Sequence, residues 1–209
     1  AHASTRGGAP VVACVDDRGD GEEIYLRTWN GSTWAEIGGS ATGGGISSTP
    51  GASTSPSVAI AADGAPIVAW EAGTGTDYEI FLRRWNGTSW AEMGGSASGG
   101  GISNNSNGSY RPSLIVGTDG TPIVAWYDAG GGDWEIYVKR WNGSAWIEMG
   151  SGSAAGGGIS NNSGASRLPA LALGPGGLPV LAREDDSSGN LEIYVRQWNG
   201  SAWEEMGSG

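Results

Sequence analysis

The acidic side chains of four glycine-rich segments are the groups in this sequence that could bind a metal ion. Calcium takes its oxygen ligands from carboxylates and carbonyls, and segments of this composition supply both. The candidate ligands are Asp16, Asp17, Asp20, Asp128, Asp133, Asp185 and Asp186. None of the segments has the spacing of an EF-hand loop, and the spacing differs between segments. Solvated turn acids are therefore the alternative interpretation.

Aromatic and amide side chains in loops form a second group, because they could contact a sugar. Trp134 and Tyr78 occupy one position in two copies of a repeated unit, where the other copies have Leu191 and Glu22. Such side chains join a large apolar face to a polar edge, which suits stacking on a sugar ring. The amide candidates, in long glycine-rich connections, are Asn104, Asn105, Asn161 and Asn162. We predict that these residues contact a ligand.

Catalytic chemistry has little support in the sequence. Glycoside hydrolysis usually needs two carboxylates on opposite sides of the scissile bond, and no unique pair stands out among the many acids. The only histidine is His2, so Ser-His or Cys-His nucleophilic catalysis lacks a base. We therefore predict that the protein is not an enzyme.

A repeat carries all of these residues. The tripeptide Trp-Asn-Gly begins at Trp29, Trp85, Trp141 and Trp198, at spacings of 56, 56 and 57 residues. A proline followed by an apolar run recurs in the same register, at Pro10, Pro66, Pro122 and Pro179. Two markers with equal spacing indicate an array of one supersecondary unit.

The second copy shows what that unit is. Its apolar and alternating runs predict four strands, A to D, at residues 57–62, 66–70, 79–85 and 90–93. Asn86-Gly87 predicts a type I′ turn between strands C and D. Four consecutive antiparallel strands are typical of a propeller blade. Strands that alternate in direction place the B–C loops and the connections between copies on one face, which is where we expect binding residues.

The sequence therefore predicts an all-β protein, a β-propeller of four four-stranded antiparallel blades. The blades are expected at about residues 1–56, 57–112, 113–169 and 170–209, within a single domain over 1–209. Helical periodicity is absent throughout. A prism or a solenoid of four-stranded units is the alternative architecture.

Two further patterns concern how each blade is held together. Gly-Gly-Gly-Ile-Ser recurs between blades, at residues 43–47, 99–103 and 156–160. We expect each of these loops to fold back onto its blade, with the isoleucine as a plug and the glycines allowing close approach of the backbone. Each strand C begins with a glutamate and has a basic residue four positions later, as in Glu79 and Arg83. We expect these charges to form inter-strand or inter-blade ion pairs.

The amino-acid composition and net charge limit the classes of binding partner that we expect. The net charge of −11 disfavours nucleic acid and anionic membranes, and is compatible with cations or neutral sugars. No apolar stretch approaches the roughly 20 residues of a membrane-spanning helix, so membrane insertion is not expected. Eleven tryptophans argue against disorder, despite 40 glycines. Cys14 is the only cysteine, so an intrachain disulfide is excluded.

Three stretches, at residues 121–126, 135–146 and 156–163, resemble a tandem repeat of large secreted or surface proteins of bacteria. Those repeats are distantly similar to Asp-box propellers and to bacterial sugar-binding propellers. The resemblance implies the propeller fold and an extracellular or cell-surface setting in a bacterium. It implies no catalytic residue.

The favoured function is a non-enzymatic, lectin-like module that binds carbohydrate through its B–C and inter-blade loops. A structural or assembly repeat of a surface layer or filament is the alternative, and a glycosidase-like enzyme is the third. The first and last copies are the least regular, with Cys14 and Arg183 where the middle copies have Trp70 and Trp126. Two chains could therefore join into an eight-bladed ring, or chains could run end to end as a filament.

Overall fold

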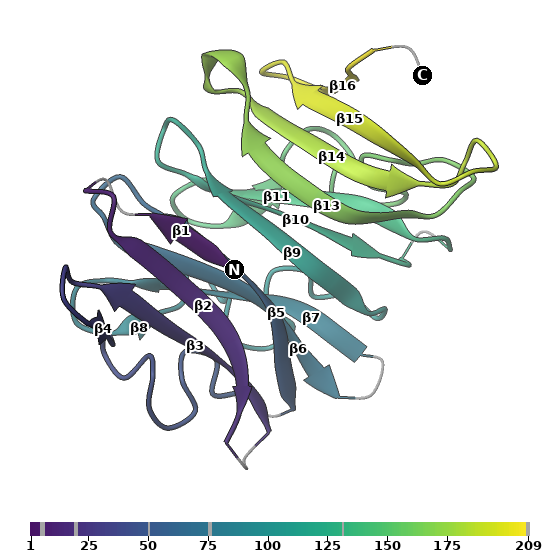
Figure 1. The fold of residues 1–209 in the computed structure, drawn as a ribbon. Helices are drawn as coiled ribbons and strands as arrows, with labels where there is room; N and C mark the ends of the chain where they lie inside the picture. The colour runs from purple at the N-terminus through teal and green to yellow at the C-terminus, as the bar shows by residue number, and fades with distance from the viewer. Residues whose placement is uncertain (5–6, 19–20, 50, 75–76, 131, 208–209) are drawn as a thin grey trace. The chain divides into compact units, whose positions relative to one another are not determined.

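The structure is a computed structural model that describes residues 1–4, 7–18, 21–49, 51–74, 77–130 and 132–207. Its strands form four sheets, each of four antiparallel strands that are neighbours in chain order (Figure 1). The only helical element in the described residues is a single 3-10 turn, η1 (Pro175–Gly177). None of the described residues forms a helix long and apolar enough to cross a membrane.

Each sheet is one of the predicted blades. Blade one has β1 (His2–Ser4), β2 (Pro10–Asp17), β3 (Glu22–Trp29) and β4 (Trp34–Ala35). Blade two has β5 (Ala52–Ile60), β6 (Pro66–Thr74), β7 (Asp77–Trp85) and β8 (Trp90–Ala91). Blade three has β9 (Ser109–Val116), β10 (Pro122–Asp128), β11 (Glu135–Trp141) and β12 (Trp146–Glu148). Blade four has β13 (Ser166–Leu173), β14 (Pro179–Asp185), β15 (Glu192–Trp198) and β16 (Trp203–Glu205).

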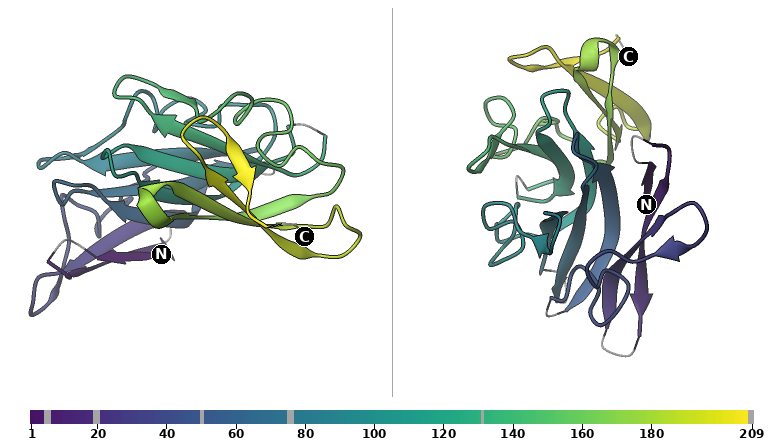
Figure 2. Two further views of the ribbon diagram at one scale, coloured as in Figure 1. Left: turned by 90° about the horizontal axis from the view of Figure 1, so that it is seen from above. Right: turned by 90° about the vertical axis from the view of Figure 1, so that its left-hand side faces the viewer.

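The chain divides into two compact units, residues 1–104 and 105–209, each of which contains two blades. In the first unit the purple strands of blade one form a layer beside the blue strands of blade two (Figure 2). Its core contains apolar side chains of both blades: Val11, Ala13, Ile24, Leu26, Ile46, Val58, Val68, Trp70, Ala72 and Phe81. The core of the second unit contains Ile123, Ala125, Ile136, Val138, Met149, Ile159 and Leu181. A single domain over residues 1–209 stays a prediction.

Strand A begins earlier than the sequence predicted, because it contains a bulge before a proline. In blade two the register shifts between Thr54 and Ser57, and Ser55 has a φ of 52°. The residues before the equivalent prolines, Arg111 and Leu168, have φ values of 53° and 50°. Proline cannot donate to the ladder, so it is confined to such irregular positions. The apolar pattern does not continue on the N-terminal side of this bulge. The sequence therefore did not predict the first half of the strand.

The turn between strands C and D is four residues long and is not type I′. Only its glycine has a positive φ, as Gly87 does at 97°. The Asn86 side chain stabilises this turn without a second residue of positive φ. Its Oδ1 accepts hydrogen bonds from the backbone N–H groups of Thr88 and Ser89 at 2.9 and 2.8 Å. Trp85 at the end of β7 pairs with Trp90 at the start of β8, whereas a two-residue turn would pair Trp85 with Thr88.

The Gly-Gly-Gly-Ile-Ser loops fold back onto strand C of their own blade, as predicted. In blade one the backbone N–H of Ile46 donates to the carbonyl of Ile24 at 2.7 Å, and the N–H of Ile24 donates to Ser47 Oγ at 2.8 Å. The same two bonds recur in blades two and three. The plug residues Ile46, Ile102 and Ile159 are all buried.

The expected ion pairs along strand C are wrong for Glu23, Glu135 and Arg83. The two glutamates are buried, and each accepts a hydrogen bond from the serine of its loop, Ser47 or Ser160. Arg83 donates from Nη1 to the carbonyl oxygen of Ile46 at 2.7 Å, in the loop that precedes its blade. The folded-back loops therefore provide neutral partners for these three residues. Arg196, at the position of Arg83 in blade four, forms an inter-strand ion pair with Glu205 at 2.8 Å.

A tryptophan of each even-numbered blade joins it to the blade before. Trp90 Nε1 donates to the carbonyl oxygen of Ile37 at 2.9 Å, and Trp203 Nε1 donates to that of Met149 at 2.8 Å. Trp90→Phe is expected to lower the free energy of unfolding by about 1 kcal/mol more than Trp85→Phe, because the Trp85 indole donates no such bond to any residue that the structure describes. Urea unfolding of both variants measures the difference, and equal losses would contradict this role.

Candidate functional site

Trp134 lies in a cluster of aromatic side chains in blade three. Its ring centroid is 5.7 Å from that of Tyr110 and 5.3 Å from that of Tyr127, and both contacts are edge-to-face. The two tyrosine rings stack on each other at 5.6 Å. All three side chains are half-buried, so part of each stays in contact with solvent. We call these three residues the aromatic cluster.

The sheet and the neighbouring blade hold the aromatic cluster in place. Tyr110 on β9 lies directly opposite Tyr127 on β10. Trp134, which precedes β11, accepts a hydrogen bond at its carbonyl oxygen from the backbone N–H of Ser166 at 2.6 Å. The guanidinium carbon of Arg167 is 5.9 Å from the Trp134 ring centroid, within the range of a cation–π contact. The surface therefore combines aromatic rings with a cationic hydrogen-bond donor.

The aromatic cluster is specific to blade three. At the positions of Tyr110 and Tyr127, blade two has Thr54 and Glu71, which form a hydrogen bond of 2.8 Å. Sequence reasoning found Trp134 and missed both tyrosines, which lie within strands and not in loops. Both tyrosines differ from the residues at the aligned strand positions of blade two. An alignment of the repeats that covered the strands as well as the loops would have identified them.

The other predicted aromatic residue, Tyr78, lies in the first unit. It belongs to β7, where it is half-buried and opposite Gly73. Blade two has no tyrosines at the strand positions that build the aromatic cluster of blade three. Contact of Tyr78 with a ligand stays a prediction.

Asn105 and Asn162 bind buried carboxylates of strand B. Asn162 Nδ2 donates to Asp185 Oδ2 at 2.6 Å, and the same oxygen accepts a hydrogen bond from Ser166 Oγ at 2.8 Å. Asn105 makes the equivalent bond to Asp128 in blade three. Both aspartates are 1% exposed or less. These amides therefore attach the inter-blade loops to the blades that follow.

Asn104 and Asn161 end the glycine-rich loops and are exposed. Their φ values are 46° and 42°, a region that asparagine tolerates better than most residues. Each backbone N–H donates at 2.9 Å to the carbonyl oxygen of a loop glycine, Gly100 or Gly157. The turn itself thus accounts for the residue type, and ligand contact stays a prediction.

Asn161 also lines a polar cleft in the second unit. The cleft has a volume of about 390 Å³, within the approximate range of small-ligand sites. It is lined by the end of the blade-three loop and by blade four, with polar and aromatic contributions from Ser151, Ser160, Asn161, Arg196, Ser201 and Trp203. It is a second place where a sugar could bind.

The predicted calcium ligands do not converge in the part of the chain that the structure describes. No group of three or more His, Cys, Asp or Glu side chains there could hold a metal ion. Asp16 pairs with Arg18 at 2.8 Å. Asp17, Asp133 and Asp186 are exposed. Asp20 lies outside the described residues. Calcium binding stays a prediction.

Asp185 is the most heavily hydrogen-bonded acid of the second unit. Besides Asn162 and Ser166, it binds the backbone N–H of Ser187 at 2.9 Å and the hydroxyl of that residue at 2.5 Å. Arg183 Nε lies 3.1 Å from its Oδ2, and both side chains are buried. The Arg183 guanidinium also lies 5.1 Å from the Tyr194 ring centroid.

These contacts predict a specific pH dependence of stability. Burial opposes the ionisation of Asp185, but hydrogen bonds from Ser187 and its other partners outweigh burial and hold the pKa of this carboxyl below its usual range. Because the unfolded-state pKa is about 3.9, the ionised group stabilises the fold above that pH, and this contribution is lost as the pH falls below about 4. Urea unfolding should show a steeper acid loss for the natural chain than for Asp185→Asn.

The four four-stranded antiparallel sheets are the blades of a β-propeller, and the aromatic cluster belongs to blade three alone. Solved structures of similar fold include a protein of unknown function from Dyadobacter fermentans, with a TM-score of 0.65 and 13% identity over 100% of this chain and 68% of that one. An α-L-arabinanase of Penicillium chrysogenum, complexed with arabinobiose, has a TM-score of 0.62 and 15% identity over 98% and 64%. An ulvan lyase bound to a saccharide has a TM-score of 0.60 and 11% identity over 98% and 56%.

These likenesses confirm the predicted fold class, an all-β propeller with four-stranded antiparallel blades. Identities this low concern the fold alone. The chain spans 56% to 68% of the length of the three structures. No family model and no curated protein sequence matches the chain.

Proposed function

We propose that the protein is a non-enzymatic module that binds carbohydrate at the aromatic cluster of blade three. The observation that carries the proposal is the meeting of Trp134, Tyr110 and Tyr127 beside Arg167, in one blade only. Aromatic faces stack on the apolar face of a sugar ring, and a guanidinium donates to its hydroxyl groups. The resemblance of the repeats to bacterial surface proteins supports an extracellular setting.

A binding module fits the chemistry of the second unit better than an enzyme does. The buried carboxylates Asp128 and Asp185 already accept several hydrogen bonds from their own blades and loops. A general acid or a nucleophile must instead face the substrate. We expect no turnover of chromogenic glycosides.

A glycan array, with calcium and again with a chelator, tests this function. We expect binding that Trp134→Ala weakens by about tenfold or more and that Trp134→Phe largely preserves, because phenylalanine keeps an aromatic face. Unchanged thermal unfolding of both variants is the control for folding. A blank array, or binding that is equal in all three proteins, would refute saccharide binding at the aromatic cluster. Loss of binding with the chelator would instead indicate that the saccharide site lies at the acidic loops and depends on calcium.

A structural repeat that assembles with further copies is the second candidate. It is favoured by the exposed apolar side chains of Leu191, Ile193 and Met206 in blade four. Sedimentation over a range of protein concentrations tests it. A monomer at all concentrations would exclude assembly of the isolated chain, whether as an eight-bladed ring or as a filament.

A further inference from the structure

The polar cleft of the second unit combines an aromatic ring with uncommitted polar side chains. The Asn161 amide and the Ser151 hydroxyl line it, and neither group forms a hydrogen bond with any residue that the structure describes. Trp203 adds a half-buried indole, whose N–H is bound to the Met149 carbonyl oxygen. The cleft therefore offers an aromatic surface together with hydrogen-bond donors and acceptors, which is the chemistry that a sugar ring requires.

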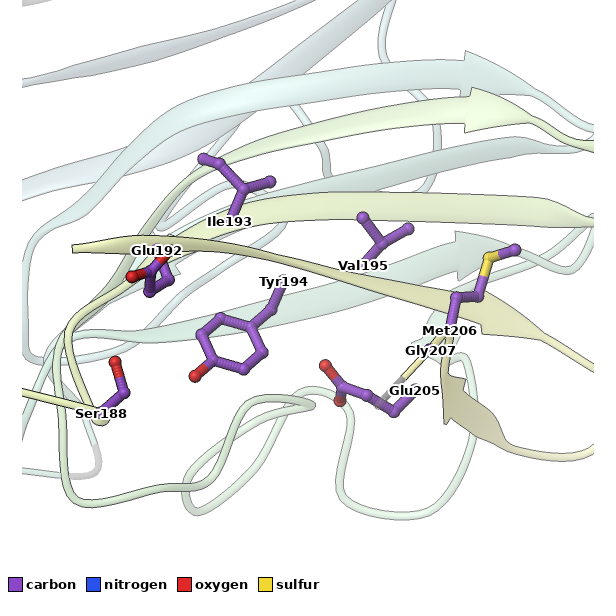
Figure 3. A pocket seen from close by; sticks show the side chains of 8 residues that line it. All are labelled: Ser188, Glu192, Ile193, Tyr194, Val195, Glu205, Met206 and Gly207. Carbon is purple, nitrogen blue, oxygen red and sulfur yellow. The ribbon is translucent and has the colours of Figure 1, made fainter. Parts of the chain in front are cut away.

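The guanidinium of the cleft is held by contacts on two sides. Arg196 Nη1 donates to the carbonyl oxygen of Ile159, in the same way as Arg83 donates to Ile46 in the first unit. Glu205 Oε2 accepts from Arg196 Nε at 2.8 Å. Figure 3 shows the Glu205 side chain at a separate groove of blade four, of about 510 Å³, which does not share Asn161 or Trp203 with the cleft.

Blade three adds one residue to the loop that forms this cleft. The isoleucine plug follows the first tryptophan of strand D by 13 positions in blade three and by 12 positions in blades one and two. The φ of Gly152, 76°, matches the 78° and 80° of Gly39 and Gly95, so the additional residue is Ser151. A loop that departs from the repeat and brings a polar side chain into a cleft is typical of a binding loop on a rigid scaffold.

Residues 161–166 connect the cleft to the aromatic cluster. Asn161 lines the cleft, and five positions later the Ser166 N–H donates to the Trp134 carbonyl oxygen at 2.6 Å. Five residues span at most about 18 Å, even when the chain is fully extended. The cleft and the aromatic cluster are therefore near neighbours within the second unit.

Hydrogen bonds hold this connection in a fixed path. The Asn162 N–H donates to Glu135 at 3.0 Å, and the Asn162 amide donates to Asp185 at 2.6 Å. The Ala165 N–H donates to Asp186 Oδ1 at 2.6 Å. A surface that is already ordered loses little conformational entropy when a ligand binds along it.

We propose that the cleft and the aromatic cluster are two subsites for one saccharide chain, so that the ligand is an oligosaccharide and not a single sugar. One ring stacks on Trp134, and a ring further along the chain binds Asn161 and Ser151. Because the two subsites share no residue and lie at opposite ends of residues 161–166, one ring cannot fill both. The inference rests on the proposed function and adds the class of ligand to it.

The dependence of affinity on chain length tests this inference. Mono- to hexasaccharides of glucose, galactose, mannose and arabinose are titrated against the chain, and binding is followed by tryptophan fluorescence. Affinity should rise at least about tenfold from the monosaccharide to the tetrasaccharide of a series that binds, because the second contact is then intramolecular. A monosaccharide that binds as tightly as its oligomers would overturn the inference and leave the aromatic cluster as a single-ring site. No binding in any series would also overturn it, and the glycan array then decides whether the proposed function fails with it.

Two chain variants locate the second subsite. Asn161→Gly and deletion of Ser151 should each remove most of the gain in affinity with chain length. Glycine tolerates the φ of 42° at Asn161, and deletion of Ser151 restores the loop length of blades one and two, so both variants should fold. Thermal unfolding checks this expectation.

Two further variants are the controls. Ser48→Gly changes the equivalent loop position of blade one, where the φ is 44°, and should leave the gain unchanged. Met206→Ala changes the separate groove of blade four and should also leave it unchanged (Figure 3). A full gain in both cleft variants would overturn the inference. A loss of the gain in Met206→Ala would overturn it too, because the chain would then extend into the other groove.

Discussion

Replacing Gly101 by alanine is expected to lower the free energy of unfolding by about 2–5 kcal/mol. The residue has a φ of 60°, and a Cβ there would lie 2.2 Å from the carbonyl oxygen of Ile80. The left-handed backbone costs an alanine roughly 1–2 kcal/mol. Relief of the overlap costs a further 1–3 kcal/mol or so, because the carbonyl accepts the loop's own hydrogen bond and cannot move freely.

Gly99→Ala is the matched control for this variant. Gly99 lies in the same loop with a φ of 55°, and no atom lies within 4 Å of the position of its Cβ. The control therefore carries the backbone cost of about 1–2 kcal/mol without the overlap. Urea unfolding of both variants gives the difference. Equal destabilisation would show that the close approach of the loop to strand C does not require glycine.

The sequence predicted the blades because each element carries its own local signal. Period-2 alternation located strand C, and the proline at its start located strand B, as in Pro66. The fixed position of Ile102 among polar residues correctly predicted a plug. Strand A was cut short, since its bulge at Ser55 breaks the alternation on which strand recognition depends.

The aromatic cluster was only partly predictable, because the residue pattern within one strand does not specify which residues of the neighbouring strand lie opposite. Trp134 stood out as an aromatic residue in a loop. Tyr110 and Tyr127 are seventeen positions apart and become neighbours only through the register of β9 and β10. Asn162 was predicted as a ligand contact, and its bond to Asp185 depends on a loop path that no local pattern specifies.

Removal of the Asp185 carboxylate is the second large effect that we expect. Asp185→Ala should lower the free energy of unfolding by about 3–5 kcal/mol, because it leaves the Arg183 guanidinium buried without a counter-charge. It also removes the acceptor of Ser166 and of the Asn162 amide, so the loop before blade four loses an attachment. Urea unfolding followed by tryptophan fluorescence measures the loss.

Arg183→Met separates the ion pair from the hydrogen bonds. The Nη1 atom of Arg183 is buried and has no hydrogen-bond partner in the described residues, so the natural guanidinium already carries an uncompensated cost. Removal of one partner of a buried ion pair usually destabilises, whereas replacement of the whole pair by apolar side chains is often neutral. For Arg183→Met we still expect a change within about 1 kcal/mol, because the hydrogen bonds to Asp185 continue to stabilise its charge. Asp185 would keep its bonds to Ser187, Ser166 and Asn162.

The double variant Arg183→Met/Asp185→Ala then decides between the two causes. If the stranded guanidinium dominates, the double variant should recover more than half of the loss caused by Asp185→Ala, with a coupling energy of roughly 2 kcal/mol. Additive effects would mean that the loss comes from the serine and asparagine donors alone. In that case Arg183 would be a tolerated departure from the tryptophan of the middle blades, with no part in holding the carboxylate in place.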